Sequence, residues 1–182
     1  MLIKIDDADC FTRCVHALQA GKVLILPTDT IYGFSGIVPD TESKILKIKK
    51  RPAEKKMIQL IAKPEDVYQY TAQVIPPTFF KLWPAPLSLI VKAKNSDETI
   101  AFRCPDKKWL RDLIEAVGMP LYSSSVNISG KKSLTSIAEI YKTFKHTVPI
   151  IVDAGDEPAI ASTVVDLTLD EPMILRRGSL SL

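Results

Sequence analysis

The stretch VLILPTDTIYGFSG, residues 23–36, indicates the fold class of the chain. Four branched apolar residues followed by Pro27 are the pattern of a short, buried strand. The strand leads into a loop with two glycines and the polar residues Thr28, Asp29, Thr30 and Tyr32. Loops at strand ends are where open α/β sheets bind ligands, so these hydroxyls could hold a small polar ligand. The alternative is that Asp29 and Thr30 only shape a turn.

Helical and strand patterns alternate along the rest of the chain. The spacing of apolar residues predicts a first helix that ends at Gly21, and a second that starts after Asp40 and stops just before Pro52. Further helical segments are predicted over residues 64–72, 76–83, 107–117 and 136–144, the last with Ser136 and Glu139 as a capping box. Further strands are predicted in MIQLIA (57–62), LSLIVKA (87–93), TIAFRC (99–104), MPLYSSS (119–125), PIIVDA (149–154), STVVDLT (162–168) and PMILRR (172–177). These elements predict an α/β or α+β sheet protein with about seven or eight strands, in one domain over residues 1–182.

Composition excludes several classes of protein. No apolar run approaches the roughly 20 residues of a membrane span, and the first ten residues carry acids where a signal peptide needs an apolar core. We therefore expect a cytoplasmic protein without a membrane segment. Cys10, Cys14 and Cys104 lack the paired spacing of a zinc site and should be reduced, buried thiols. With only His16 and His146 in the chain, a metal centre held by the protein is not expected.

The stretch KIKKRPAEKK, residues 47–56, concentrates the positive charge. It holds six basic residues and one acid in a chain of net charge +3, so the other residues sum to −2. Local basicity favours a small anionic ligand over a broad nucleic-acid-binding surface. If Pro52 keeps the preceding residues extended, Lys49 and Arg51 project to the same side and can bind one anion. The alternative is a solvated helix surface. Three other lysines of this stretch are expected in solvent: Lys47, Lys50 and Lys56.

The stretch YSSSVNISGKKS, residues 122–133, follows an apolar strand with three serines, an asparagine and a glycine. Short hydroxyls and freed backbone N–H groups can make a phosphate nest, although they can also satisfy one another in a turn. Ser162, Arg176 and Arg177 are further candidates near the C-terminus, where an arginine is more often a surface charge. No Ser-His-Asp, Cys-His or Walker-type arrangement occurs, so nucleophilic hydrolysis and P-loop nucleotide binding gain no support.

Seven motifs, in this order, resemble those of the YrdC/TsaC family of threonylcarbamoyl-AMP synthases. The family's Pro-Thr-Glu-Thr-x-Tyr-Gly loop is similar to PTDTIYG (27–33), its Lys-x-Arg-Pro to KKRP (49–52) and its Trp-Pro-Gly-Pro to WPAP (83–86). Its Val-Arg-x-Pro is similar to FRCP (102–105), its Ser-x-Asn to SVN (125–127), its Ser-Thr-Val-Val-Asp to STVVD (162–166) and its Leu-Arg-x-Gly to LRRG (175–178). The resemblance spans nearly the whole chain, and the order of the motifs makes it specific.

The resemblance implies a single twisted, mixed β-sheet flanked by helices, a YrdC/RibB-like fold with a concave basic groove. It also implies a nucleotidyltransferase that makes threonylcarbamoyl-AMP and pyrophosphate from L-threonine, bicarbonate and ATP with Mg²⁺. A tRNA-threonylcarbamoyl transferase complex would then pass the threonylcarbamoyl group to a tRNA adenosine.

Site residues follow from the same matching, position by position. The family's catalytic Lys-x-Arg plus Ser-x-Asn tetrad falls on Lys49, Arg51, Ser125 and Asn127. The implied nucleotide contacts are Arg51, Lys55, Ser125, Ser133 and Arg176. The implied threonine contacts are Thr30, Arg103, Ser123 and Ser162.

Departures from the family pattern limit this matching. Asp29 stands where the family has glutamate, and Arg177 where it has proline, which leaves open whether Arg176 or Arg177 faces the nucleotide. Lys-Lys-Met at residues 55–57 replaces the Asn-Pro-Leu of longer members, and no additional C-terminal domain follows the motifs, so we expect the short bacterial branch. Two alternatives remain open: a module of the same fold that binds double-stranded or ribosomal RNA, and a paralogue that acts on another amino acid. Weak contact with tRNA is compatible with either the enzyme or the module.

Overall fold

A computed structural model of the chain describes residues 1–52, 56–157 and 160–182. Within them one ten-stranded sheet has the order β1-β8-β2-β3-β7-β4-β6-β5-β9-β10. The strands are β1 (Leu2–Lys4), β2 (Leu24–Leu26), β3 (Gly33–Ile37), β4 (Ile58–Leu60), β5 (Leu87–Lys92), β6 (Thr99–Arg103), β7 (Leu121–Ser125), β8 (Ile151–Asp153), β9 (Thr163–Asp166) and β10 (Met173–Arg176). Four pairs are parallel, namely β1–β8, β2–β8, β4–β6 and β5–β9, and the others are antiparallel. The expected mixed sheet is confirmed.

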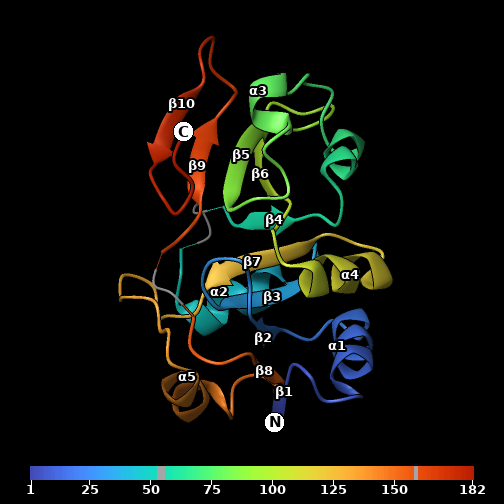
Figure 1. Cartoon of the computed structure of the whole chain (residues 1–182), viewed down its shortest axis with the longest axis vertical. Coiled ribbons are helices and arrows are strands. Elements are labelled where there is room, and N and C mark those ends of the chain that lie inside the picture. The colour runs from blue at the N-terminus through green and yellow to red at the C-terminus, as the bar shows by residue number, and fades with distance from the viewer. Residues whose placement is uncertain (53–55, 158–159) are drawn as a thin grey trace.

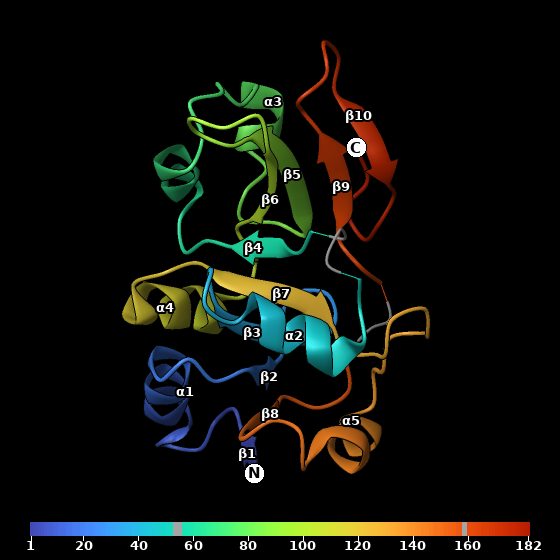
Figure 2. The ribbon, with the colours of Figure 1, turned by 180° about the vertical axis from the view of Figure 1, so that it is seen from behind.

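The sheet changes direction strongly along its length. Strands β3 and β7 run across the long axis of the molecule, whereas β5, β9 and β10 run along it (Figures 1 and 2). Between the two parts lies β4, which pairs with β7 on one side and with β6 on the other. This twist brings residues of strands from both parts around one hollow, which is the site described below.

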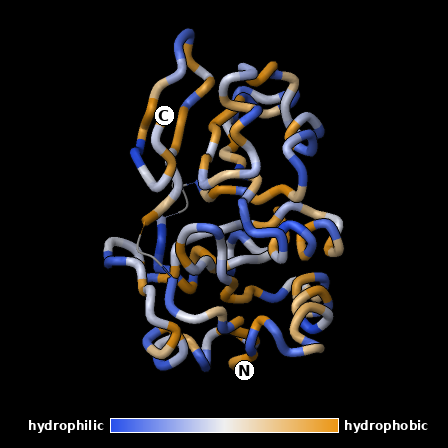
Figure 3. The backbone as a smooth tube through the Cα atoms, in the orientation of Figure 1, coloured by the Kyte–Doolittle hydropathy of each residue, from blue (hydrophilic) through white to orange (hydrophobic). Residues whose placement is uncertain are grey.

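Helices cover both faces of the first part of the sheet, which consists of β1, β8, β2, β3 and β7. Helices α1 (Cys10–Gln19) and α4 (Lys108–Val117) pack on one face, and α2 (Glu42–Lys49) and α5 (Ile137–Phe144) pack on the other. Strand β2 shows why: Leu24 and Leu26 join the cluster with α1 and α4, while Ile25 joins the cluster with α2 and α5. The 3₁₀ segment η1 (Pro64–Gln69) and α3 (Pro77–Phe80) accompany β5, β6 and β9 in a third cluster. Hydrophilic and hydrophobic residues alternate along the outer helices α1 and α5 (Figure 3).

Helix α2 differs from its prediction at both ends. It begins at Glu42, with Thr41 rather than Asp40 at the N-cap position. It ends at Lys49 because Lys50 takes a left-handed conformation with φ of 50°. The N–H of Lys50 bonds the carbonyl of Lys47 at 3.2 Å, and the N–H of Arg51 bonds that of Leu46 at 3.0 Å. This is a Schellman motif, so capping hydrogen bonds rather than the steric effect of proline end the helix.

The capping box predicted for α5 is also wrong. Ser136 occupies the N-cap position, but its side chain makes no capping hydrogen bond. The carboxylate of Asp156 accepts the N–H of Ile137 at 2.9 Å instead. An acid distant in the sequence therefore caps the helix, which no local pattern could reveal.

Two strands were missed from the sequence, β1 and β3. Gly33 and Gly36, expected in a loop, both lie in β3, where glycine is unfavourable on propensity alone. A Cβ atom on Gly33 would lie 2.8 Å from Ser123 Oγ, and one on Gly36 would overlap the side chain of Thr41. Close packing against neighbours therefore accounts for glycine at both positions.

The predictions on cysteines and membrane segments can be compared directly. Cys10, Cys14 and Cys104 are buried and free, as expected. Among residues 1–52, 56–157 and 160–182, no helix combines the length and the apolar character needed to cross a bilayer.

Candidate functional site

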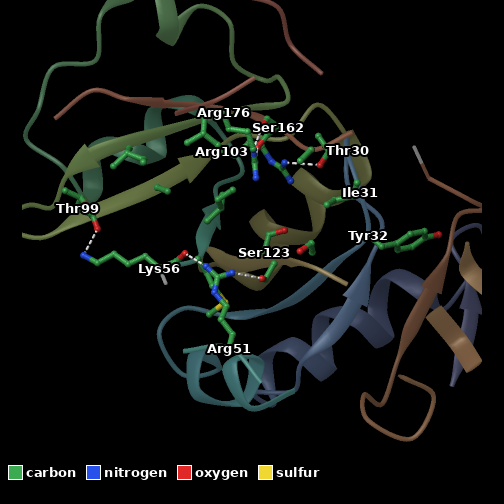
Figure 4. A pocket seen from close by; sticks show the side chains of 18 residues that line it. Thr30, Ile31, Tyr32, Arg51, Lys56, Thr99, Arg103, Ser123, Ser162 and Arg176 are labelled. Atoms are coloured by element: carbon green, nitrogen blue, oxygen red, sulfur yellow. Dashed lines mark hydrogen bonds between the residues drawn. The ribbon is translucent and has the colours of Figure 1, made fainter. Parts of the chain in front are cut away.

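A pocket of about 310 Å³ lies where the two parts of the sheet meet (Figure 4). Its walls come from the loop before β3, the chain on either side of the gap before β4, strands β4, β5, β6 and β7, and the C-terminal strands β9 and β10. Predicted site residues that line it are Thr30, Arg51, Arg103, Ser123, Ser125, Ser162 and Arg176. Residues separated by up to about 145 positions in the sequence therefore meet in one hollow.

Arg103, at the end of β6, is the most buried cation of the pocket. Its Nη2 lies 3.5 Å from Asp29 Oδ1, and both side chains are 4% exposed. Its Nη1 donates to Thr30 Oγ1 at 3.0 Å, whereas its Nε has no partner in the described part of the chain. Burial lowers the pKa of Arg103; the carboxylate of Asp29 opposes this effect, and the charge of Arg176 adds to it. Two neighbouring guanidinium groups and the single carboxylate that contacts Arg103 leave a net positive charge for an anionic ligand.

Arg176, in β10, faces the pocket beside Arg103 (Figure 4). Its Nε donates to the carbonyl oxygen of Ser162 at 2.9 Å, and its Nη2 donates to Ser162 Oγ at 3.0 Å. Gly178 permits this arrangement, because a Cβ atom there would overlap the backbone of Ala161 and Ser162. Arg177 is not among the residues that line the pocket. Of the two arginines, Arg176 is therefore the one that faces the pocket.

Arg51 occupies the other end of the pocket. Its Nη2 donates to the carbonyl oxygen of Lys56 at 2.7 Å and its Nη1 to Ser124 Oγ at 3.3 Å, and burial lowers its pKa. Lys56, expected on the solvated surface, also lines the pocket, and its ammonium binds Glu98 at 3.1 Å and the carbonyl oxygen of Thr99 at 3.0 Å. No local pattern selects Lys56 for the pocket, because its hydrogen-bond partners come from the distant β5–β6 hairpin.

Lys49 and Arg51 do not face the same pocket, and the extended geometry expected for residues 49–52 is wrong. Lys49 is the last residue of α2, is 2% exposed and does not line the pocket. Its ammonium donates to the carbonyl oxygen of Ser125 and to Asn127, at 2.6 Å to Oδ1 and 3.2 Å to the carbonyl oxygen. Burial, with a smaller effect from the charge of Arg51, lowers the pKa of Lys49 to about 8. Lys49 thus holds the segment after β7 from behind the pocket.

The three serines lie in strand β7, as the strand predicted over residues 119–125 implies, rather than in the polar loop that follows it; β7 pairs with β3 and β4. Ser125 Oγ donates to Asn127 Oδ1 at 2.8 Å, so Ser125 and Asn127 form one network with Lys49. Asn127 and Ser133 are not among the residues that line the pocket. Lys55 lies outside the described residues.

Chemically, the pocket suits a polyanion that carries polar groups. Three arginines and Lys56 supply positive charge, and hydroxyls of Thr30, Ser162 and β7 supply directional hydrogen bonds. Apolar residues form the rest of the wall, among them Ile58, Ile90 and Val164. These apolar residues were not predicted, because they meet only through the pairing of distant strands: β4 with β6 and β7, and β5 with β6 and β9.

The chain is similar in sequence to several known proteins. The family model Sua5_yciO_yrdC, described as "Telomere recombination", matches residues 16–178. Threonylcarbamoyl-AMP synthase of Pyrococcus abyssi is 33% identical over 180 residues, which cover 91% of this chain and 53% of that protein. The chain thus spans about half the length of this relative.

Solved structures show the same fold. The crystal structure of P. abyssi Sua5 complexed with L-threonine has a TM-score of 0.86 and 30% identity, covering 99% of this chain and 58% of that one. E. coli YciO has a TM-score of 0.84 at 22% identity, covering 98% and 94% of the two chains, which shows the shared fold alone. With the family model matching most of its length, the chain belongs to the Sua5/YciO/YrdC family.

Proposed function

We propose that this chain is an L-threonylcarbamoyladenylate synthase, which converts L-threonine, bicarbonate and MgATP into threonylcarbamoyl-AMP and pyrophosphate. One observation carries the proposal: Arg103, Arg176, Thr30 and Ser162 gather at one end of the pocket, and Arg51 lies at the other (Figure 4). Such a pocket offers one cationic end to an amino-acid carboxylate and another to the phosphates of a nucleotide. The names of the synthase of P. abyssi and of the threonine-bound Sua5 structure support this substrate class.

The reaction would need little acid–base chemistry from the protein. The threonine amine and carbon dioxide, supplied by bicarbonate, give a carbamate with loss of a proton. A carbamate oxygen then attacks the α-phosphorus of ATP, and the bond to pyrophosphate breaks. Positioning and charge neutralisation dominate such phosphorus chemistry, and magnesium would enter with the ATP phosphates.

Each pocket residue then has a distinct task. Arg103 would bind the threonine carboxylate, with Thr30, Ser123 and Ser162 around the amino acid. Arg51 and Ser125 would contact the nucleotide, and Arg176 would contact it from the end that it shares with Arg103. Lys49 and Asn127 would act from behind the pocket, because Lys49 donates to the carbonyl oxygen of Ser125 and Asn127 accepts the hydroxyl of Ser125.

Downstream, we infer that a tRNA-threonylcarbamoyl transferase complex receives the product. A mixed anhydride of a carbamate and a phosphate is reactive, so its consumption by a second protein fits its chemistry. A cytoplasmic location stays a prediction from the sequence.

The test is release of pyrophosphate by the purified chain with MgATP, bicarbonate and threonine. We expect release that depends on threonine, together with an adenylate of the mass of threonylcarbamoyl-AMP. Pyrophosphate no higher than in a blank without threonine would reject the synthase. Serine in place of threonine should give weaker release by about tenfold to a few hundredfold, since one methyl group distinguishes them.

A further inference from the structure

Two pocket hydroxyls each have a second, buried hydroxyl behind them. Thr30 in the loop before β3 lies 3.0 Å from Thr28, oxygen to oxygen, and Ser162 lies 2.9 Å from Ser88 of β5. Thr28 and Ser88 are 1% and 0% exposed and are not among the residues that line the pocket. Because a hydroxyl has one hydrogen and two lone pairs, these hidden partners can determine what Thr30 and Ser162 offer a ligand.

Thr30 is restricted to accepting. Thr28 Oγ1 lies 2.8 Å from the carbonyl oxygen of Ile31, which can only accept, so the hydrogen of Thr28 is used there. One lone pair of Thr28 Oγ1 accepts the backbone N–H of Thr30 at 3.1 Å, and the other accepts the hydroxyl hydrogen of Thr30 in the 3.0 Å contact between the two oxygens. One lone pair of Thr30 already receives Arg103 Nη1 at 3.0 Å. What remains for a ligand is the second lone pair.

Ser162 is restricted to donating. In the described part of the chain, the hydroxyl of Ser88 has Ser162 Oγ as its one hydrogen-bond partner. Ser88 must donate, because a fully buried hydroxyl hydrogen without an acceptor is costly. Ser162 Oγ also receives Arg176 Nη2 at 3.0 Å, so both its lone pairs are occupied. Its own hydrogen is left for a ligand.

We propose that Thr28 and Ser88 are positioning residues that fix the hydrogen-bond direction of the pocket, with Thr30 as acceptor and Ser162 as donor. This inference rests on the proposed function and adds the orientation of the amino acid. The carboxylate lies toward Ser162 and the two arginines, and a neighbouring donor, the amine or the side-chain hydroxyl, lies toward Thr30. The reversed orientation would place a donor against Ser162 and the carboxylate against a lone pair. The ligand class is therefore a small amino acid whose carboxylate is next to a hydrogen-bond donor.

The first test measures L-threonine binding by calorimetry in the absence of ATP. Thr28→Val removes the hydroxyl at similar volume and should raise Kd by about tenfold, whereas Thr28→Ser should stay within about threefold of the native chain. Thr71→Val is a matched control. Thr71 is buried like Thr28, donates to the carbonyl of Lys92 at 2.6 Å and accepts the N–H of Gln73 at 3.0 Å, but it does not line the pocket. Its variant should bind threonine as the native chain does.

A double-mutant cycle separates positioning from general structural support. In a Thr30→Val background, Thr28→Val should weaken threonine binding no further, because the acceptor it orients is gone. Ser88→Ala provides a second, independent cycle with Ser162→Ala, which keeps the inference testable if Thr28→Val fails to fold. Equal losses in both backgrounds, or native affinity in the Thr28→Val and Ser88→Ala variants, would overturn the inference.

The outcomes for the inference and for the proposed function can be told apart. Native affinity in those two variants, with pyrophosphate release that still requires threonine, overturns the inference alone. If the native chain binds no threonine, the inference falls, and pyrophosphate release separately decides the proposed function.

Discussion

Replacing Lys49 by methionine tests the strongest electrostatic feature of the structure. Methionine keeps an unbranched, apolar side chain of similar length and removes the ammonium group. In the native chain that ammonium is enclosed, with oxygen atoms of Ser125 and Asn127 as its hydrogen-bond acceptors. Burial first, and the charge of Arg51 second, lower the pKa of Lys49 from 10.5 to about 8.

This lowered pKa predicts a specific dependence of stability on pH. Below pH 8 both the folded and the unfolded states carry the proton, and the folded state bears the full cost of the buried charge. Between pH 8 and 10.5 the folded state has lost the proton while the unfolded state keeps it, so stability rises with pH. The difference between the two pKa values corresponds to about 3 kcal/mol, or about 1.4 kcal/mol for each pH unit.

Urea denaturation of the native chain and of Lys49→Met, from about pH 7 to about pH 9.5, measures the effect. The free energy of unfolding of the native chain should gain about 2 kcal/mol over that of the variant between about pH 8 and about pH 9.5. Taking the difference removes the contributions of other titrating groups. Lys47→Met, on the exposed side of the same helix, should follow the native pH dependence. Parallel profiles for the native chain and Lys49→Met would refute the reasoning.

The remaining predictions concern turnover, measured as threonine-dependent pyrophosphate release. Arg51→Ala should lower kcat/KM about a hundredfold, because it removes one positive charge from the pocket, while the variant stays folded under assay conditions. Lys49→Ala should cause a similar loss indirectly, and a crystal structure should show the segment after β7 displaced. Arg176→Ala should cost about a hundredfold while Arg177→Ala stays within about twofold; the reverse order would contradict the side-chain placement. Gly178→Ala should lower kcat/KM at least about tenfold, because its methyl group must displace the backbone that Arg176 binds.

Local sequence signals predicted most of the elements, whereas the family resemblance supplied many of the pocket residues. Strand β2 was recognisable because both its faces are buried, which gives a continuous apolar run. Strand β3 was not, because its glycines are explained only by close contact with Ser123 and Thr41. The same holds for the apolar wall of the pocket: Ile58 is placed opposite Ala101 and Ser123 by the pairing of β4 with two strands far along the chain. Pairing of distant strands has no local signature, so these neighbours could not be predicted.

The backbone conformation of Lys50 places the two cations on either side of it, Lys49 and Arg51, in different environments. An extended segment would have placed Lys49 and Arg51 on one side. The left-handed Lys50 instead reverses the chain between them, which leaves Lys49 inside the last turn of α2 and Arg51 beyond it. One charge is therefore buried against Ser125 and Asn127, and the other is free to face the pocket. The two side chains still meet through β7, because Arg51 Nη1 binds Ser124 Oγ while Lys49 binds the next carbonyl along the strand. Loss of either residue should thus disturb the same strand, from behind for Lys49 and from within the pocket for Arg51.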